Sequence, residues 1–458
     1  MKVLVCGAGQ VGSNIARQLA SEGNDVTVID QSQELVRKIS DSFDARGIVG
    51  HASHPDVLKR AGAEECDMMI AVTYADEVNM VACQVAHTLF NVPMKIARVR
   101  SQAYLDPRWG NLFGRDNMPI DVRISPEIEV ARTVKRALDV PGAFDMIPFA
   151  DDRVRLIGVH ITEDSPTINT PLRQLTELFP DLHCVVTGIF RNERLIVPDD
   201  DDQMLPGDDV YFIVRTDHLS RAMPLFGHEE NQARRIVIVG GGNIGLFLAR
   251  QIEEEQPAVK LKVIERDARR AEYIAEQLKR AVVLQGSALE TDILQEASVH
   301  SAEAIVALTN DDQVNLIASL MAKKMGAKTA VTLINNQAYD SLTSSIGIDV
   351  AVNPRATTVS GILQHVRRGR IRQVYSVRDG GAEVIDAEAL ETSPLVGVPL
   401  REAELPEDTI IGAIVRGDEV ILPRGGTVIQ AHDRVILFAL HGAVREIEKM
   451  FSVRLEFF

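Results

Sequence analysis

Two glycine-rich segments in this chain have the residue types and the spacing that bind the phosphates of a dinucleotide. Both follow the pattern G-x-G-x-x-G, and each lies between a short apolar run and a helical stretch. A second apolar run follows each helix and ends in an acid, Asp30 or Glu265. The glycine segments are Gly7-Ala8-Gly9-Gln10-Val11-Gly12 and Gly240-Gly241-Gly242-Asn243-Ile244-Gly245. Strand, glycine turn, helix, strand and acid, in this order and twice over, predict two dinucleotide-type folds.

Each part of this pattern has a chemical role. The first glycine permits a tight turn, the second lets phosphate oxygens approach the backbone, and the third allows the helix to pack closely on the sheet. Free N–H groups at the helix start, together with the helix dipole, attract the anion. The acid accepts hydrogen bonds from ribose hydroxyls and repels a 2′-phosphate, which favours NAD(H) or another adenine nucleotide over NADP. Arg266, next to Glu265, leaves this preference open for the second copy. A Rossmann-like fold with an empty site is the alternative for either copy.

The similarity between the two halves of the chain extends beyond the glycines. Residues 73–79 share the pattern T-x-x-D-x-V-N with residues 309–315, and S-P followed by P-L occurs at 165–172 and again at 393–400. Whole halves are therefore duplicated. In the second half the apolar periodicity predicts strands at 236–239, 261–264, 281–284, 304–308 and 329–334, and helices at 243–255, 269–278, 289–296 and 312–325. This alternation predicts an α/β fold with a doubly wound parallel sheet in each half.

The T-x-x-D-x-V-N segments follow the predicted fourth strand of each sheet. In such a sheet a ligand binds at the carboxyl edge of the strands, so Thr73 and Thr309 are expected to border the nucleotide. Asp76 and Asp312 are expected to cap the next helix, while Asn79 and Asn315 lie inside it. Capping and packing alone remain an alternative for these acids and amides. An amphipathic helix then follows, with Ile128, Ala131, Val134 and Leu138 on one face.

The end of each half is different in character, with short strands, one helix and a hairpin. We predict a small α+β module there, without a catalytic constellation. The acidic run 199–202 is either a cation site or a solvated loop. The predicted domains are two Rossmann-like nucleotide-binding domains, residues 1–124 and 232–352, and two small modules, residues 140–227 and 368–453.

Composition excludes several classes of function. The chain has 458 residues and a net charge of −16, so it is a poor candidate for binding nucleic acid or anionic lipid. No apolar stretch is long enough to cross a bilayer, and the first strand begins too early to leave room for a signal peptide. The four cysteines, Cys6, Cys66, Cys83 and Cys184, have no metal-ligand spacing and are read as buried apolar residues.

These features resemble the RCK (or KTN) regulators of potassium transport, and within them the two-repeat peripheral regulatory subunits of bacterial Trk potassium uptake systems. The resemblance rests on the doubled glycine motif, the two acids, the T-x-x-D-x-V-N segments and the small modules, and it covers essentially the whole chain. It implies the order RCK N-domain, C-domain, N-domain, C-domain. It also implies NAD(H), or ATP/ADP as alternative ligands, and a homo-oligomeric ring of RCK domains. The ring would sit on the cytoplasmic face of the inner membrane, against an integral membrane potassium-translocating subunit of the Trk type.

The resemblance also assigns residues to the two sites. The first would use Gly7 to Val11 for phosphates, Asp30 for ribose, Thr73 and Tyr74 at the rim, and Arg98 near the end of the fifth strand. The second would use Gly240 to Ile244, Glu265, Thr309 and Asn310. Two departures from the family pattern stand out. Apolar Leu333, or neighbouring Thr332, stands where the first half has Arg98, and Gly50-His51 and Gly286-Ser287 replace a frequent Gly-Asp. We therefore expect unequal sites, with the first the better dinucleotide binder.

The leading hypothesis is a regulatory, nucleotide-binding protein and not an enzyme. The alternative is a soluble NAD-dependent oxidoreductase, which needs a substrate domain with a general acid or base beside the nicotinamide. No pairing of His, Lys or Tyr in the small modules suggests such a domain. A nucleotide-sensing transcription regulator is disfavoured because the chain is acidic and has no basic helix.

Overall fold

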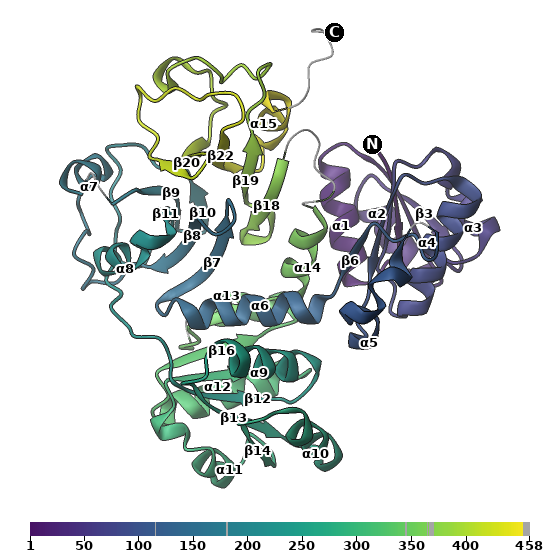
Figure 1. The fold of residues 1–458 in the computed structure, drawn as a ribbon, viewed down its shortest axis with the longest axis horizontal. Coiled ribbons are helices and arrows are strands. Elements are labelled where there is room, and N and C mark those ends of the chain that lie inside the picture. Colours follow the sequence, from purple (N-terminus) through teal and green to yellow (C-terminus); the bar gives the residue numbers. More distant parts are fainter. Residues whose placement is uncertain (115, 180–181, 344–345, 364, 366–370, 452–458) are drawn as a thin grey trace. The chain divides into compact units, whose positions relative to one another are not determined.

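The structure is a computed structural model that describes residues 1–114, 116–179, 182–343, 346–363, 365 and 371–451 (Figure 1). The described residues form two compact units. The first holds residues 1–129 and 355–365, and the second holds the remainder. In this described part, no helix combines the length and the apolar character that a bilayer span requires.

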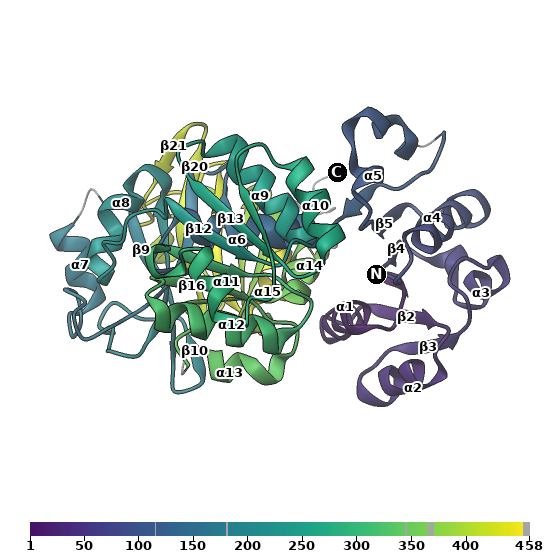
Figure 2. The ribbon, with the colours of Figure 1, turned by 90° about the horizontal axis from the view of Figure 1, so that it is seen from below.

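The first unit is built on a parallel sheet with strand order β3-β2-β1-β4-β5-β6. Its strands are β1 (Lys2–Cys6), β2 (Asp25–Asp30), β3 (Arg46–Val49), β4 (Met68–Ala71), β5 (Met94–Arg98) and β6 (Val122–Ile124). Its helices are α1 (Gln10–Ser21), α2 (Gln33–Ser42), α3 (Pro55–Arg60), α4 (Asp76–Phe90), α5 (Gln102–Leu105) and the 3-10 turns η1 (Ala63–Glu65) and η2 (Pro107–Phe113). The strand order reverses at β1 and β4, so right-handed crossovers put α1 and α2 on the face opposite to α3 and α4 (Figure 2). The carboxyl ends of β1 and β4 open at this switch point.

The second unit contains an equivalent parallel sheet with strand order β14-β13-β12-β15-β16-β17. Its strands are β12 (Arg235–Val239), β13 (Lys260–Glu265), β14 (Val282–Gln285), β15 (Ala304–Ala307), β16 (Thr329–Leu333) and β17 (Val350–Val352). Its helices are α9 (Asn243–Glu255), α10 (Ala268–Gln277), α11 (Thr291–Glu296), η5 (Val299–Ser301), α12 (Asp312–Met325), η6 (Gln337–Tyr339) and α13 (Asp340–Thr343). Alternate residues of β12 face two different cores, Ile236 and Ile238 on the α9 side and Val237 and Val239 on the α12 side. A strand buried on both faces explains why this run of sequence is apolar throughout.

Helix α6 (Pro126–Asp139) links the first unit to the second, and α14 (Pro354–Leu363) follows the second parallel sheet. The apolar face of α6 that the sequence predicted is buried: Ala131, Val134 and Leu138 pack in one core with α9. Lys135 adds polar contacts, 2.9 Å to Asp139 and 2.8 Å to Glu255 of α9. This amphipathic face therefore joins the core of the second parallel sheet.

The two small modules are antiparallel sheets with helices at their edges. The first has strand order β10-β9-β11-β8-β7 and the second has β18-β19-β22-β20-β21. The first comprises β7 (Ala143–Phe149), β8 (Val154–His160), α7 (Leu172–Leu178), β9 (Cys184–Arg191), β10 (Arg194–Ile196), β11 (Asp209–Arg215), η3 (Thr216–His218), α8 (Leu219–Ala222) and η4 (Met223–Phe226). The second comprises β18 (Ile371–Val377), η7 (Arg378–Gly380), β19 (Ala382–Glu388), η8 (Leu400–Glu402), β20 (Thr409–Arg416), β21 (Glu419–Ile421), β22 (Arg434–Leu440) and α15 (Val444–Met450). Both modules contain a helix, as the sequence predicted: α7 and the short α8 in the first, and α15 in the second. The segment after P-L is helical as α7 in the first module and forms only the short turn η8 in the second.

The two modules share a hydrophobic core. Ile147, Phe149, Leu156 and Ile213 of the first cluster with Val384, Ile436 and Phe438 of the second. Two glycines make room for this packing in a reciprocal way. A Cβ on Gly188 would lie 2.6 Å from the Phe438 ring, and a Cβ on Gly412 would lie 2.3 Å from Ile213. Each module thus inserts a side chain into a glycine gap of the other, as expected for an interface between duplicated copies.

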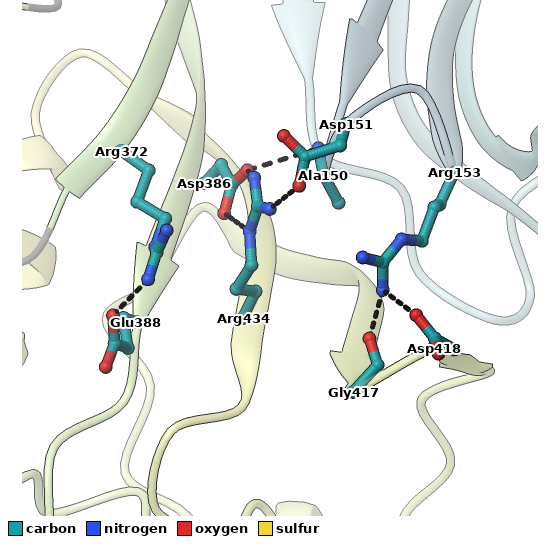
Figure 3. Close-up of polar contacts among 9 residues, drawn as sticks. All are labelled: Ala150, Asp151, Arg153, Arg372, Asp386, Glu388, Gly417, Asp418 and Arg434. Atoms are coloured by element: carbon teal, nitrogen blue, oxygen red, sulfur yellow. Dashed lines mark hydrogen bonds and ion pairs between the residues drawn. The ribbon is translucent and has the colours of Figure 1, made fainter.

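Polar contacts at the edge of this core join the two modules as well (Figure 3). Arg434 of β22 contacts the buried Asp386 and reaches Asp151 of the first module, 2.5 Å away. The Ala150 N–H donates to Asp386 at 3.3 Å. Arg153 donates to the Gly417 carbonyl and lies 3.5 Å from Asp418. The modules are therefore held by both apolar packing and charged pairs.

The cysteines lie where the sequence predicted. Cys6, Cys66 and Cys83 are buried, and Cys184 is half-buried. Burial raises the pKa of Cys66 to about 11 and that of Cys83 to about 12, so these thiols stay protonated at neutral pH.

The acidic run 199–202 is a loop, and two of its four carboxylates make local contacts. Asp201 pairs with Arg173, and Asp202 accepts the Asp199 N–H at 2.7 Å. Among the described residues, no group of three or more His, Cys, Asp or Glu is arranged to hold a metal ion.

Candidate nucleotide-binding sites

The first glycine segment forms a cradle between β1 and α1. Gly7 has φ +112°, which favours glycine, and a Cβ there would lie 3.1 Å from the backbone of Val72 and Thr73. A Cβ on Gly12 would lie only 1.9 Å from the Gly7 carbonyl oxygen. At Gly9, by contrast, no described atom lies within 4 Å of a Cβ position. The first and third glycines are thus required by packing, while the second opens the loop to an approaching ligand.

The second cradle, between β12 and α9, repeats this geometry. Gly240 has φ +99°, and a Cβ there would lie 3.0 Å from Thr309 N. A Cβ on Gly245 would lie 2.0 Å from the Gly240 carbonyl oxygen, and the position at Gly242 is open within 4 Å of the described atoms. In both cradles the N-cap residue is the second glycine, which has no side chain to accept from the first-turn N–H groups. Within the described part of the chain, the N–H groups of Gln10, Val11, Asn243 and Ile244 have no acceptor, so they can bind an anion.

The predicted ribose acids lie beside their glycine loops. Asp30 accepts the Ala8 N–H at 2.7 Å and the Ser32 N–H at 2.8 Å. Glu265 accepts the Gly241 N–H at 2.7 Å and the Asp267 N–H at 2.9 Å. Each carboxylate oxygen keeps a second lone pair for a ribose hydroxyl. The loop and the acid are therefore fixed to one another before any ligand is bound.

The T-x-x-D-x-V-N segments position the ends of neighbouring strands. Asn79 is fully buried in α4, where its Oδ1 accepts from Thr73 N at 2.8 Å and from Thr73 Oγ1 at 2.7 Å. Its Nδ2 donates to the carbonyls of Thr73 and Arg98, at 3.2 and 3.0 Å. Asn315 makes the same four contacts, with Thr309 and with the carbonyl of Leu333. Placing Asn79 and Asn315 inside the helices was correct, and their function as ties between strand ends adds to that prediction.

The expectation that Asp76 and Asp312 cap their helices is wrong. Asp76 is the first residue of α4, but its carboxylate accepts the N–H groups of Arg100 and Ser101, beyond the end of β5. Asp312 likewise accepts from Asn335 N and Asn336 N, at 2.9 and 2.8 Å. In the second half it is Asp311 that caps α12, through the N–H groups of Gln313 and Val314. An acid at a helix start can accept either from the N–H groups of its own helix or from a loop that is distant in sequence. The sequence pattern is the same in both cases, so it does not reveal that the loop after the fifth strand is the partner here.

Thr73 and Tyr74 leave the end of β4, and Arg98 ends β5 next to them. Tyr74 is 84% exposed, and the Arg100 guanidinium lies 5.3 Å from its ring centroid. Arg98 is half-buried, and its Nε has no hydrogen-bond partner among the described residues. Burial lowers the pKa of Arg98, and the nearby Arg100 lowers it further. An anionic ligand would supply the partner that this guanidinium lacks.

The second site has no cation at this position. Asn315 donates to the Leu333 carbonyl as Asn79 donates to that of Arg98, so Leu333, and not Thr332, occupies the place of Arg98. Leu333 is buried, and Thr332 bonds to Ser319 at 2.8 Å. Thr309 is half-buried, and Asn310 is exposed at the corresponding edge. The two cradles therefore share their loops and acids but differ at the end of the fifth strand.

Comparison with known proteins shows which family this duplicated chain matches. The TrkA-N domain model matches residues 3–115 and 236–354, and the TrkA-C domain model matches residues 156–227 and 384–452. The chain is 52% identical over 458 residues to the Trk system potassium uptake protein TrkA of Azorhizobium caulinodans, with 100% of both chains covered. The chain belongs to the TrkA family. A protein of the same description from Halomonas elongata is 42% identical over 462 residues, again with 100% of both chains covered.

A solved structure shares the fold of this TrkA-family chain. The structure described as "GsuK channel bound to NAD" aligns with a TM-score of 0.60 and 16% identity, over 99% of this chain and 79% of that chain. Together with the family match, this confirms the predicted fold class of two parallel-sheet Rossmann-like domains, each followed by a small module. The four domain boundaries, and the contacts of each predicted site residue with a nucleotide, stay predictions.

Proposed function

We propose that this protein is a cytosolic nucleotide-binding regulatory subunit that gates a membrane potassium uptake channel or transporter. The observation that supports this most is the pair of preformed cradles, each with an open second glycine and an acid bonded to the loop. The full-length relatives that are 52% and 42% identical are named potassium uptake proteins, which favours this function over a soluble oxidoreductase.

The proposed ligands are NAD(H), with ATP/ADP as alternatives. The solved GsuK channel of the same fold is described as bound to NAD. In this chain, the N–H groups after Gly9 and Gly242 would hold the phosphates, and Asp30 and Glu265 would accept from the ribose. Thr73, Tyr74 and Arg98 would border the first ligand, and Thr309 and Asn310 the second.

Nucleotide can act on a gate only if it binds one shape of the protein better than another. A roughly tenfold preference corresponds to about 1.4 kcal/mol per site, and several sites in one assembly add their preferences. We propose that the chain assembles into a homo-oligomeric ring on the cytoplasmic face of the inner membrane. There it would bind the integral membrane potassium-translocating subunit of a Trk system.

Replacing Asp30 with alanine is expected to lower the affinity of the first site for NADH by about tenfold. The side chain would no longer accept from the ribose, and a hydrogen bond to a charged group is worth about 1.5–3 kcal/mol. Calorimetric titration of the full chain measures the affinity, and potassium flux through the reconstituted membrane partner measures the response.

Asp25→Ala is the matched control, because Asp25 is an exposed acid at the opposite end of the same strand. It should leave both NADH affinity and flux unchanged. Wild-type affinity and a wild-type flux response in Asp30→Ala would contradict the proposed function.

A further inference from the structure

Helix α2 follows Asp30 and helix α10 follows Glu265, and their first turns carry different residues at one matching position. In the first half, Ser32 Oγ accepts the Leu35 N–H at 3.3 Å and caps α2. In the second half, Asp267 Oδ1 accepts the Arg270 N–H at 2.8 Å and caps α10. Leu35 and Arg270 therefore occupy the same structural position. One cradle has an apolar side chain there, and the other has a guanidinium.

Arg270 is held against the glycine loop of the second cradle. Its Nε donates to the Gly241 carbonyl at 2.8 Å, while Glu265 accepts the Gly241 N–H at 2.7 Å. The Tyr273 ring centroid lies 5.0 Å from the Arg270 guanidinium carbon. Arg270 and Glu265 thus bind the two backbone polar groups of the same loop residue, Gly241. The guanidinium is placed at the ribose-binding edge of the cradle, next to the acid.

One nitrogen of this guanidinium lacks a partner. Nη2 of Arg270 is buried, and it has no hydrogen-bond partner in the part of the chain that the structure describes. Leaving a buried donor unsatisfied costs about 1–3 kcal/mol, and more for a charged group. A bound anion at this edge would supply the missing acceptor, and a guanidinium matches the geometry of a phosphate.

The residues around Arg270 are also more positively charged than the matching residues of the first half. Residues 30–35 of the first half carry two acids and no base, whereas residues 265–270 of the second carry two acids and three arginines. Arg266 and Arg269 are exposed, next to Arg270. A phosphate, with a charge of about −1.5 to −2 at neutral pH, is repelled by the two acids of the first edge, whereas at the second edge the three arginines outnumber the two acids.

Arg98 and Arg270, each with one nitrogen that has no partner among the described residues, also lie on opposite sides of their cradles. In each sheet the strand of the glycine loop stands between the acid-bearing strand and the fourth and fifth strands. Arg98 ends the fifth strand of the first sheet, where the second has Leu333, and Arg270 follows the acid-bearing strand of the second, where the first has Leu35. Each half therefore places a guanidinium that has one unpartnered nitrogen, among the described residues, on a different side of its cradle.

We propose that the second cradle accepts an adenosine nucleotide whose ribose carries an additional phosphate, as in NADP(H), and that the first cradle excludes it. Arg270 is the specificity-determining residue, and the exposed Arg266 and Arg269 add only a weak, solvent-screened attraction. This inference rests on the proposed nucleotide-binding function and assigns different ligand classes to its two sites.

The test is calorimetric titration, with NADPH and with NADH, of the full chain carrying Gly9→Ala, whose methyl group occupies the phosphate space of the first cradle and leaves Asp30 in place. Arg270→Leu copies the residue of the first half, and it should lower NADPH affinity at least tenfold while changing NADH affinity less than twofold. Arg270→Lys keeps the charge but loses the paired N–H donors of the guanidinium, so its NADPH affinity should lie between those of wild type and Arg270→Leu. Arg269→Leu is the matched control, because it removes an exposed arginine from the same turn, and it should have little effect.

Adenosine 2′,5′-bisphosphate and adenosine 3′,5′-bisphosphate distinguish the two sources of a phosphorylated ribose, and Arg270-dependent binding of either supports the proposal. Thermal unfolding of each variant confirms that the chain remains folded. NADPH affinity that does not depend on Arg270, or NADH bound with NADPH excluded, would overturn this inference alone. Absence of binding by every nucleotide would overturn the proposed function with it.

Discussion

Replacing Arg434 with alanine is expected to lower the free energy of unfolding of the second unit by about 3–5 kcal/mol. The Arg434 guanidinium contacts Asp386 through Nε at 3.2 Å and Nη2 at 2.5 Å, and Nη1 lies 2.5 Å from Asp151. The Asp386 side chain is fully buried. Without Arg434, the only contact of this carboxylate among the described residues is the 3.3 Å hydrogen bond from the Ala150 N–H, and it becomes an uncompensated buried charge. Chemical denaturation, followed by circular dichroism, measures the loss.

A second ion pair of the same module provides the control. Arg372 lies 2.6 Å from Glu388, but half of the Arg372 side chain is exposed to solvent (52%). Arg372→Ala should therefore cost less than about 1 kcal/mol, as exposed ion pairs generally do. The double variant Arg434→Met with Asp386→Leu removes both charges and should recover most of the stability that Arg434→Ala loses. Equal losses for the Arg434 and Arg372 variants would contradict the assignment of Arg434 as the principal charged contact between the modules.

The pairing of the small modules could not be predicted from the sequence, although their strands could. Alternating apolar residues and turn residues predict a short antiparallel strand without naming the surface that it covers. The partners of Gly188 and Gly412 are Phe438 and Ile213, which are 250 and 199 residues away along the chain. A glycine within a strand indicates a close approach, but only the folded chain shows what approaches.

The parallel sheets were predictable because their signals are local. The predicted helices at 243–255 and 312–325 agree with α9 and α12, because each combines helical periodicity with a defined start. The segment after P-L differs between the two modules, since it forms α7 in the first and only η8 in the second. There the flanking patterns are the same, and the local pattern alone does not decide the length of the helix.

The sequence predicted the glycine loops of the candidate sites, but it did not predict the residues that tie the strand ends together or the residue that we propose sets ligand specificity. G-x-G-x-x-G and the acid identify the cradle because packing requires the first and third glycines, while the approach of a ligand requires the second glycine and the acid. Asn79 and Asp76 tie the ends of β4 and β5 through backbone groups of Arg98, Arg100 and Ser101, which no spacing rule reveals. Arg270 resembled an ordinary surface residue of a helix in the sequence, and its contact with the Gly241 carbonyl distinguishes it.

The glycines of the first cradle allow its binding role to be separated from its folding role. Gly12→Ala is expected to reduce nucleotide affinity at the first site by about a hundredfold, or about 2.8 kcal/mol. Its new methyl would meet the Gly7 carbonyl oxygen at 1.9 Å, so the loop and α1 must move apart. Overpacking of this kind also lowers the free energy of unfolding by about 1–3 kcal/mol. Calorimetry with NADH and thermal unfolding of the same samples measure the two effects.

Gly9→Ala separates the effect on ligand binding from the effect on folding, because no described atom outside the neighbouring residues lies within 4 Å of a Cβ position at Gly9. Its stability should match wild type, while its methyl group occupies the space that phosphate oxygens need and lowers affinity by at least tenfold. A Gly9→Ala protein that binds NADH as tightly as wild type would show that the ligand does not approach this loop. Loss of binding in both variants, with loss of stability in Gly12→Ala alone, is the pattern expected if the second glycine serves the phosphate and the third serves the fold.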